Sequence, residues 1–167
     1  MHKLLPVIAA VLLSLVGGCS ECRFRQDTSS AMSPAILPNE VITADLSAYR
    51  KTGPSRWDVI VFHPPPEAVA KADDIWMLRV IALPGERVSI RDGGIYINGK
   101  REAQPDRLAG IRYTLTVPGA VEAEVSFPYR VPADCYFVLG DNATNSLDSR
   151  FWGAMPRQRI LGKVKDK

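Results

Sequence analysis

Short apolar runs rich in valine, isoleucine and aromatic residues recur along the chain after residue 40. Runs of this length and composition are typical of β-strands. Turn signals lie between two pairs of neighbouring runs, at residues 92–94 (DGG) and 98–99 (NG), which accept the positive φ angles of a tight hairpin. The pattern predicts strands in seven runs, residues 41–46, 59–62, 75–83, 88–90, 95–97, 136–139 and 160–164.

The proline content and the length of the chain favour a mostly β fold built as one globular unit. Thirteen prolines in 167 residues make long helices improbable after the first 20 residues. Residues 101–132 differ from their surroundings, because they combine scattered polar residues, weak alternation and four prolines. We expect residues 29–167 to form the domain, with 101–132 as a peripheral insertion, either a small β subdomain or a long surface excursion.

An uncharged apolar segment, residues 4–18, follows Lys3 at the N-terminus. It is shorter than the roughly 20 residues that span a bilayer as a helix. Residues 1–20 are therefore interpreted either as a short uncleaved membrane anchor or as a lipoprotein signal, in which Val16-Gly17-Gly18-Cys19 resembles a lipobox and Cys19 is lipidated. A plain cleaved signal peptide is a third interpretation. All three place the rest of the chain outside the cytoplasm, with the polar residues 21–28 as a tether.

Charge and cysteine content exclude several classes of partner. The net charge is only +3 and the chain has no run of basic residues, which argues against nucleic-acid binding. The two histidines, His2 and His63, and the three cysteines show no metal-ligand spacing, so we expect no metal and no cofactor. A bridge between Cys22 and Cys135 stays open, because spacing alone does not decide it.

Four segments, in order, resemble the signature boxes of the type I signal peptidase family. The first box, residues 29–34 (SSAMSP), resembles the family's S-x-S-M-x-P, and the second, 56–62 (RWDVIVF), resembles R-G-D-[IV]-[IV]-V-F. The third box, 76–86 (WMLRVIALPGE), resembles Y-I-K-R-V-[IV]-G-L-P-G-D. The fourth box, 140–150 (GDNATNSLDSR), resembles G-D-N-x-x-N-S-x-D-S-R and is the most specific. The resemblance implies a signal-peptidase-like antiparallel β fold.

The resemblance also implies a serine nucleophile and a lysine general base at two positions that this chain fills differently. Ala31 stands at the nucleophile position and Leu78 at the base position. Alanine has no oxygen to attack a peptide carbonyl, and leucine has no amine to accept a proton. We therefore expect a catalytically inactive member, and since lysine to leucine is not a usual inactivating substitution, a natural loss of both groups is favoured over an engineered one.

By the same resemblance, the supporting residues match. Ser29 corresponds to an oxyanion-stabilising serine, Ser146 to the serine that orients the lysine, and Asp148 and Arg150 to a structural ion pair. The last three have an alternative and favoured interpretation, as residues that order the loop. Four apolar residues are candidates for a groove that binds an extended substrate or for an edge that faces the membrane, although each alone is more often a core residue: Met32, Trp57, Trp76 and Met77.

Two functions follow as hypotheses. The first is a non-catalytic, membrane-tethered module that binds an extended peptide, a preprotein or a pilin-like subunit, by strand addition. The second is an active maturation protease with a relocated dyad, made of Ser29 or Ser33 with His63. We expect Ser30 to point away from Ala31 if residues 29–36 are extended, and His63 to be an exposed residue opening a proline-rich loop.

Overall fold

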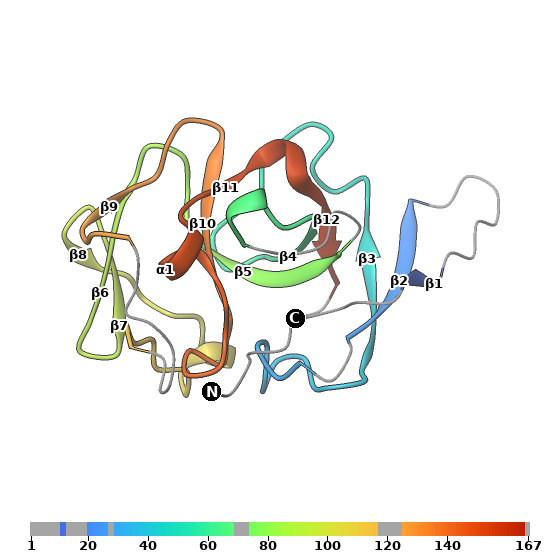
Figure 1. Ribbon diagram of the computed structural model, residues 1–167, viewed down its shortest axis with the longest axis horizontal. Coiled ribbons are helices and arrows are strands. Elements are labelled where there is room, and N and C mark those ends of the chain that lie inside the picture. The colour runs from blue at the N-terminus through green and yellow to red at the C-terminus, as the bar shows by residue number, and fades with distance from the viewer. Residues whose placement is uncertain (1–10, 13–19, 27–28, 69–73, 117–124, 166–167) are drawn as a thin grey trace.

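Two antiparallel sheets make up the protein in the computed structural model, which describes residues 11–12, 20–26, 29–68, 74–116 and 125–165. They lie side by side, the smaller at the left of Figure 1. The larger sheet has the order β1 (Val11–Leu12), β2 (Glu21–Arg25), β3 (Val41–Asp45), β12 (Ile160–Val164), β4 (Val59–Phe62), β5 (Trp76–Ala82), β10 (Cys135–Leu139) and β11 (Met155–Pro156). The smaller has the order β8 (Lys100–Arg101), β7 (Gly94–Ile97), β6 (Arg87–Arg91) and β9 (Tyr129–Arg130).

Helices in the described part of the chain are short. They are η1 (Pro66–Ala68), η2 (Asp106–Leu108), α1 (Ser149–Trp152) and η3 (Arg157–Arg159). All seven apolar runs coincide with strands, and the mostly β, antiparallel prediction is confirmed. Both hairpin turns have the expected geometry, with positive φ at Asp92, Gly93, Asn98 and Gly99.

Strands β5 and β10 separate two hydrophobic cores. Successive residues of β10 alternate between them, because side chains point to opposite faces of a strand. Val138 packs into the first core, between η1, β3, β4, β12 and α1, whereas Phe137 and Leu139 pack into the second, against the smaller sheet. All seven residues of β5 are buried, since the strand lies between β4 and β10. The segment after β10, which contains the fourth box, therefore begins in the interior of the protein.

The prediction of a tether over residues 21–28 is wrong for its first five residues. Glu21–Arg25 forms β2 and pairs with β3 along its whole length. Its side chains alternate, with Phe24 buried in the first core and Arg23 and Arg25 exposed. The polar composition concealed the strand, because one of its two faces is turned to water and carries charged side chains. Residues 27–28 lie outside the described residues.

Residues 101–132, expected to be a peripheral insertion that is either a small β subdomain or a long surface excursion, include two short strands. The two ends of this stretch contribute β8 and β9 to the smaller sheet. Leu108, Tyr113 and Val131 are at most 2% exposed and belong to the second core. With Ile111, the segment therefore contributes four of the fourteen buried residues of that core. Residues 117–124 lie outside the described residues.

The predicted membrane segment, residues 1–20, also lies almost wholly outside the described residues. Within it, Val11–Leu12 forms β1 and pairs with β2. The part of the chain that the structure describes contains no helix with the length and apolar character needed to cross a bilayer.

Candidate functional site

The first box forms a series of turns, so the expectation of an extended segment is wrong. The amide of Ser33 donates to the carbonyl of Ser30 (3.0 Å), and the amide of Ile36 donates to the carbonyl of Met32 (2.9 Å). Consequently Ser29 does not lie a full strand step from Ala31. Its hydroxyl oxygen accepts a hydrogen bond from the Ala31 amide at 3.2 Å.

The fourth box holds the first box in place. Asn142 donates its amide hydrogen to the carbonyl of Ala31 (2.9 Å), and the Asn145 side chain donates to the Ser30 hydroxyl (2.6 Å). A Cβ atom on Gly140 would lie 2.5 Å from the Ala31 carbonyl oxygen and 2.3 Å from Ser146 Oγ. Only glycine permits so close an approach. The carbonyl of Ala31 and the hydroxyl of Ser146 therefore both pack against Gly140.

Leu78 lies beside the same point, in the middle of β5. Leu139 of β10 pairs with Arg79 of β5, so continuing the antiparallel register places Gly140 beside Leu78. The Leu78 side chain is 2% exposed and belongs to the first core. The carbonyl of Ala31 and Leu78 therefore both lie next to Gly140, in buried and apolar surroundings.

Ser146 carries the polar atom that does not fit these apolar surroundings. The residue is 1% exposed, and its hydroxyl oxygen has no hydrogen-bond partner among the described residues. Buried hydroxyl groups are nearly always paired, because an unpaired one loses its hydration without compensation. Leucine at position 78 has no atom that could pair with it.

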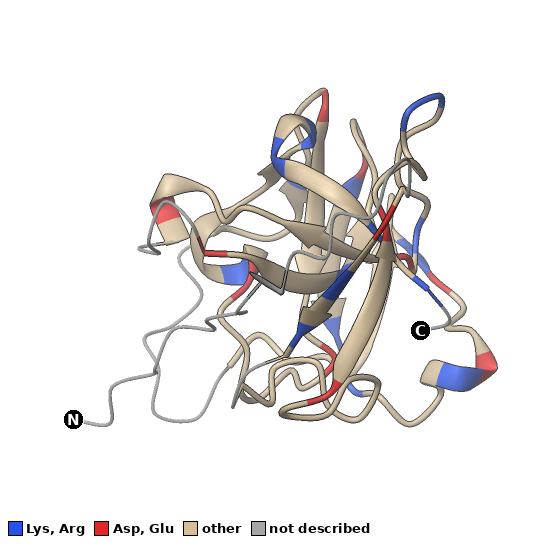
Figure 2. Cartoon of the chain, turned by 90° about the vertical axis from the view of Figure 1, so that its right-hand side faces the viewer, with Lys and Arg blue, Asp and Glu red and all other residues tan. Residues whose placement is uncertain are grey.

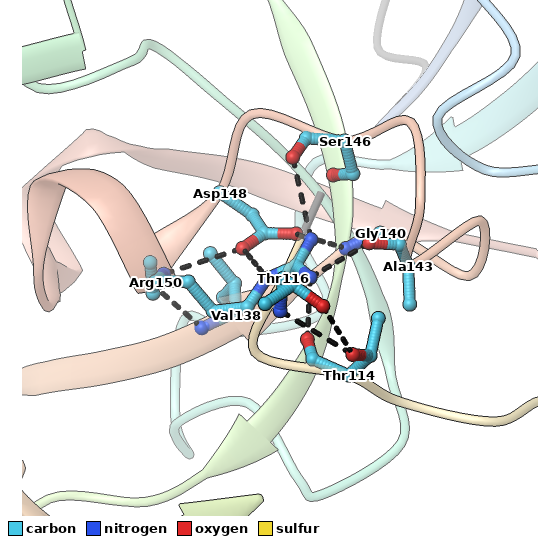
Figure 3. A network of polar contacts seen from close by, with 9 residues as sticks. Thr114, Thr116, Val138, Gly140, Ala143, Ser146, Asp148 and Arg150 are labelled. Carbon is cyan, nitrogen blue, oxygen red and sulfur yellow. Dashed lines mark hydrogen bonds and ion pairs between the residues drawn. The ribbon is translucent and has the colours of Figure 1, made fainter. Parts of the chain in front are cut away.

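Asp148 and Arg150 form a buried, bidentate ion pair (Figure 3). Arg150 Nε donates to Asp148 Oδ1 and Nη2 donates to Oδ2, both at 2.8 Å. The guanidinium also donates to the carbonyls of Ala143 (2.7 Å) and Thr114 (2.6 Å), while Asp148 Oδ2 accepts the Gly140 amide at 3.1 Å. The pair thus fixes both ends of the fourth box.

A second buried ion pair, between Arg79 and Asp141, was not anticipated from the sequence. Arg79 Nε donates to Asp141 Oδ1 at 2.7 Å and Nη2 donates to Oδ2 at 2.6 Å, and neither side chain is exposed. Arg79 Nη1 also donates to the carbonyl of Trp57 at 2.7 Å. One guanidinium therefore joins the second, third and fourth boxes. A single arginine in an otherwise apolar strand was the signal that could have revealed it, because a buried charge requires a partner.

The four residues predicted to line a substrate groove lie in the hydrophobic cores instead. None of them is more than 8% exposed, and Trp57 packs in the second core while the other three, Met32, Trp76 and Met77, pack in the first. Trp57 adopts φ 72°, a left-handed conformation, at a position where the family pattern has glycine. In this structure these side chains form no common exposed surface.

His63, the base of the relocated dyad, is not brought together with the site. His63 is half-buried, contrary to the expectation of an exposed residue, and its Nδ1 lies 3.1 Å from the carbonyl oxygen of Asp74. In the register of β4 with β5, Ile60 pairs with Leu78, so His63 lies three residues further along, about 10 Å away. The geometry gives no support to a base at His63.

The structure shows Cys22 and Cys135 as free thiols, and Cys19 lies outside the described residues. Burial, with a smaller contribution from Asp134, raises the pKa of Cys135, which disfavours the reactive thiolate. Within the described residues no three His, Cys, Asp or Glu side chains cluster as metal ligands.

Comparison with known proteins gives a consistent match. The family model described as signal peptidase, peptidase S26, matches residues 1–166. "Probable signal peptidase I-2" of Synechocystis sp. is 34% identical over 159 residues, covering 95% of this chain and 68% of the relative. Signal peptidase I of Leptolyngbya laminosa is 36% identical over 146 residues, covering 81% of this chain and 63% of the relative. The chain thus spans about two thirds of the length of these relatives.

A solved structure matches as well. The crystal structure of a signal peptidase I from Enterococcus faecalis V583 has a TM-score of 0.52 and 33% sequence identity, and the match covers 68% of this chain and 98% of that chain.

Proposed function

The chain belongs to the signal peptidase family, peptidase S26, and from this premise we propose that it binds an extended peptide of a preprotein without cleaving it. One observation carries the proposal. The hydroxyl of Ser146 is buried without a partner among the described residues, beside the carbonyl of Ala31 and the side chain of Leu78. The surroundings of a serine and lysine dyad are retained, and the two reacting groups are absent.

The chemistry supports loss of catalysis. Peptide hydrolysis by a serine and lysine pair needs an oxygen nucleophile at position 31 and a neutral amine at position 78. Removing a nucleophile and base that act as a unit costs on the order of 10⁶ in rate in serine proteases. The Ser29 hydroxyl and nearby amides could still polarise a carbonyl, but this alone leaves only slow turnover.

Binding is supported by the number of buried contacts that hold the site together. Two fully buried ion pairs and a glycine in close contact with two residues hold the first, second, third and fourth boxes together. The relatives at 34 and 36% identity are named signal peptidases. We propose that the partner is an extended stretch of a preprotein or a pilin-like subunit, bound beside the first box by main-chain pairing.

We also propose that the N-terminal apolar segment attaches the domain to a membrane on its extracytoplasmic side. The support is the uncharged stretch of residues 4–18 after Lys3. Whether the apolar segment remains as an anchor or is cleaved off before Cys19, which then carries a lipid, is decided by mass spectrometry of the mature N-terminus, comparing the unaltered protein with Cys19→Ala.

The experiment combines binding and turnover on one fluorescent preprotein peptide. Anisotropy measures binding, and mass spectrometry of the same samples measures cleavage. The proposal predicts saturable binding with no product above background. Product formation that is abolished by Ser33→Ala or His63→Ala would instead establish an active protease with a relocated dyad, and absence of binding would refute the binding role.

A further inference from the structure

A cavity of about 680 Å³ lies outside the candidate site, between the turn after β6 and the segment that follows η2. Its volume falls within the range of pockets that hold small molecules or peptide side chains. It is lined by Ile90, Arg91, Asp92, Gly93, Arg112, Tyr113, Thr114, Leu115, Thr116 and Thr144. Two arginines and three threonines are therefore among the residues that line one space.

The two arginines are held in position by contacts that leave donors available. The Arg112 guanidinium packs over Gly93, where a Cβ atom would lie 2.6 Å from Nη2, and it donates to the Asp92 carbonyl at 3.4 Å. Arg91 stacks on the ring of Tyr96, with its Cζ atom 3.9 Å from the ring centre. Both arginine residues are exposed, and neither has an acidic partner among the ion pairs of the described residues.

The charge of the lining favours an anion. Asp92 is the one acidic residue among the lining residues, against two arginines. Thr114 Oγ1 and Thr116 Oγ1 lie 3.2 Å apart, so only one of their two protons is used between them. A carboxylate could accept from a guanidinium fork and a hydroxyl at once, an arrangement of strong, charge-assisted hydrogen bonds.

The cavity and the candidate site share a structural element. Arg150, which pairs with Asp148, donates through Nη1 to the carbonyl of Thr114 in the cavity wall. The same guanidinium donates to the carbonyl of Ser146. Figure 3 shows Thr114 and Thr116 beside this network. The hydrogen bonds of Arg150 thus connect the wall of the cavity to the fourth box, which in turn contacts the first box.

We propose that this cavity binds an acidic side chain, aspartate or glutamate, of the polypeptide that occupies the site. The proposal rests on the proposed function, because it assumes that a peptide is bound. It assigns Arg112 and Arg91 as residues that determine which preproteins bind, a role separate from any chemistry at positions 31 and 78.

The test uses fluorescent preprotein peptides in which one glutamate is placed at successive positions, with a matched glutamine series. At one position or more, the glutamate peptide should bind about tenfold more tightly than its glutamine counterpart, an effect that weakens with added salt. Arg112→Gln, or Arg91→Gln, should abolish this preference while leaving the affinity for the glutamine peptide unchanged, which also shows that the variant is folded. Arg107→Gln, an exposed arginine on η2 outside the cavity, should retain the preference.

The other outcomes separate the two proposals. Equal binding of glutamate and glutamine peptides at every position would overturn the acidic-pocket proposal and leave the proposed function standing. No binding of either series would overturn both. Loss of sedimentation with phosphatidylglycerol vesicles in Arg112→Gln, without any preference among peptides, would overturn it in favour of a lipid phosphate.

Discussion

Two neighbouring parts of the site differ sharply in how their polar groups are satisfied. Around Arg150, the guanidinium donates hydrogen bonds to Asp148 and to three backbone carbonyls. Around Leu78, the buried Ser146 hydroxyl has no partner among the described residues. We infer that the ion pairs of the site contribute to folding, and the proposed function assigns the groups missing at positions 31 and 78 to catalysis alone.

The largest effect is expected from a substitution that breaks the ion pair of Asp148 and Arg150. Asp148→Asn removes the negative charge that Arg150 needs, and it leaves a buried guanidinium without compensation. We expect a loss of about 3–5 kcal/mol in the free energy of unfolding, measured by urea denaturation. Lys163→Gln is the control, because Lys163 is 45% exposed in its pair with Asp58, and it should cost less than about 1 kcal/mol. Equal costs would show that the buried pair is not structural.

A smaller effect is expected where the two regions meet. Gly140→Ala places a methyl group 2.3 Å from Ser146 Oγ and 2.5 Å from the Ala31 carbonyl oxygen. One of these groups must move, at a cost of about 1–3 kcal/mol in unfolding free energy. Gly110→Ala meets nothing within 4 Å and should change stability by less than about 0.5 kcal/mol. A Gly140→Ala protein as stable as the control would contradict the close contact of the first and fourth boxes.

Two buried serines of one segment, Ser146 and Ser149, are expected to change stability in opposite directions when replaced by alanine. Ser149→Ala should destabilise by about 1–3 kcal/mol, because Ser149 Oγ accepts from the buried Val138 amide at 3.0 Å. Ser146→Ala removes an unpaired hydroxyl and should be neutral or stabilise by about 1 kcal/mol. Thermal unfolding of both variants is the measurement. Destabilisation by Ser146→Ala equal to that of Ser149→Ala would show that its hydroxyl is paired.

The smallest effect concerns the partly exposed pair of Arg56 and Glu86. Burial alone would raise the pKa of Glu86, but hydrogen bonds from Arg56 and the Leu83 amide, with the attraction of Arg56, lower it below its ordinary value of 4.5. The stability from this group is therefore present above pH 4.5 and is lost as pH falls through the lowered pKa. Glu86→Gln should reduce the loss of unfolding free energy on acidification by less than about 1 kcal/mol, which flattens the acid side of the plot of unfolding free energy against pH. An unchanged slope would refute the assignment.

Local pattern was enough to predict the strands, since alternation and turn residues act over a few positions. It failed for residues 21–25, where the strand depends on pairing with β3, which lies sixteen or more residues further along the chain. The apolar letters at Met32 and Trp76 did not distinguish a binding groove from a core, because both require the same side chains. Likewise, the partner of Arg79 lies 62 residues away in the sequence at Asp141, and no spacing rule connects the two.

The central claim, that only two groups are missing from an otherwise retained site, is tested most directly by restoring both. The account predicts no cleavage of a preprotein peptide by the unaltered protein, by Ala31→Ser or by Leu78→Lys, and measurable cleavage by Ala31→Ser with Leu78→Lys. Ala31→Ser with Leu78→Met should stay inactive, because methionine has an unbranched side chain like that of lysine but no amine. Cleavage by the unaltered protein at the rate of the restored variant would contradict the account.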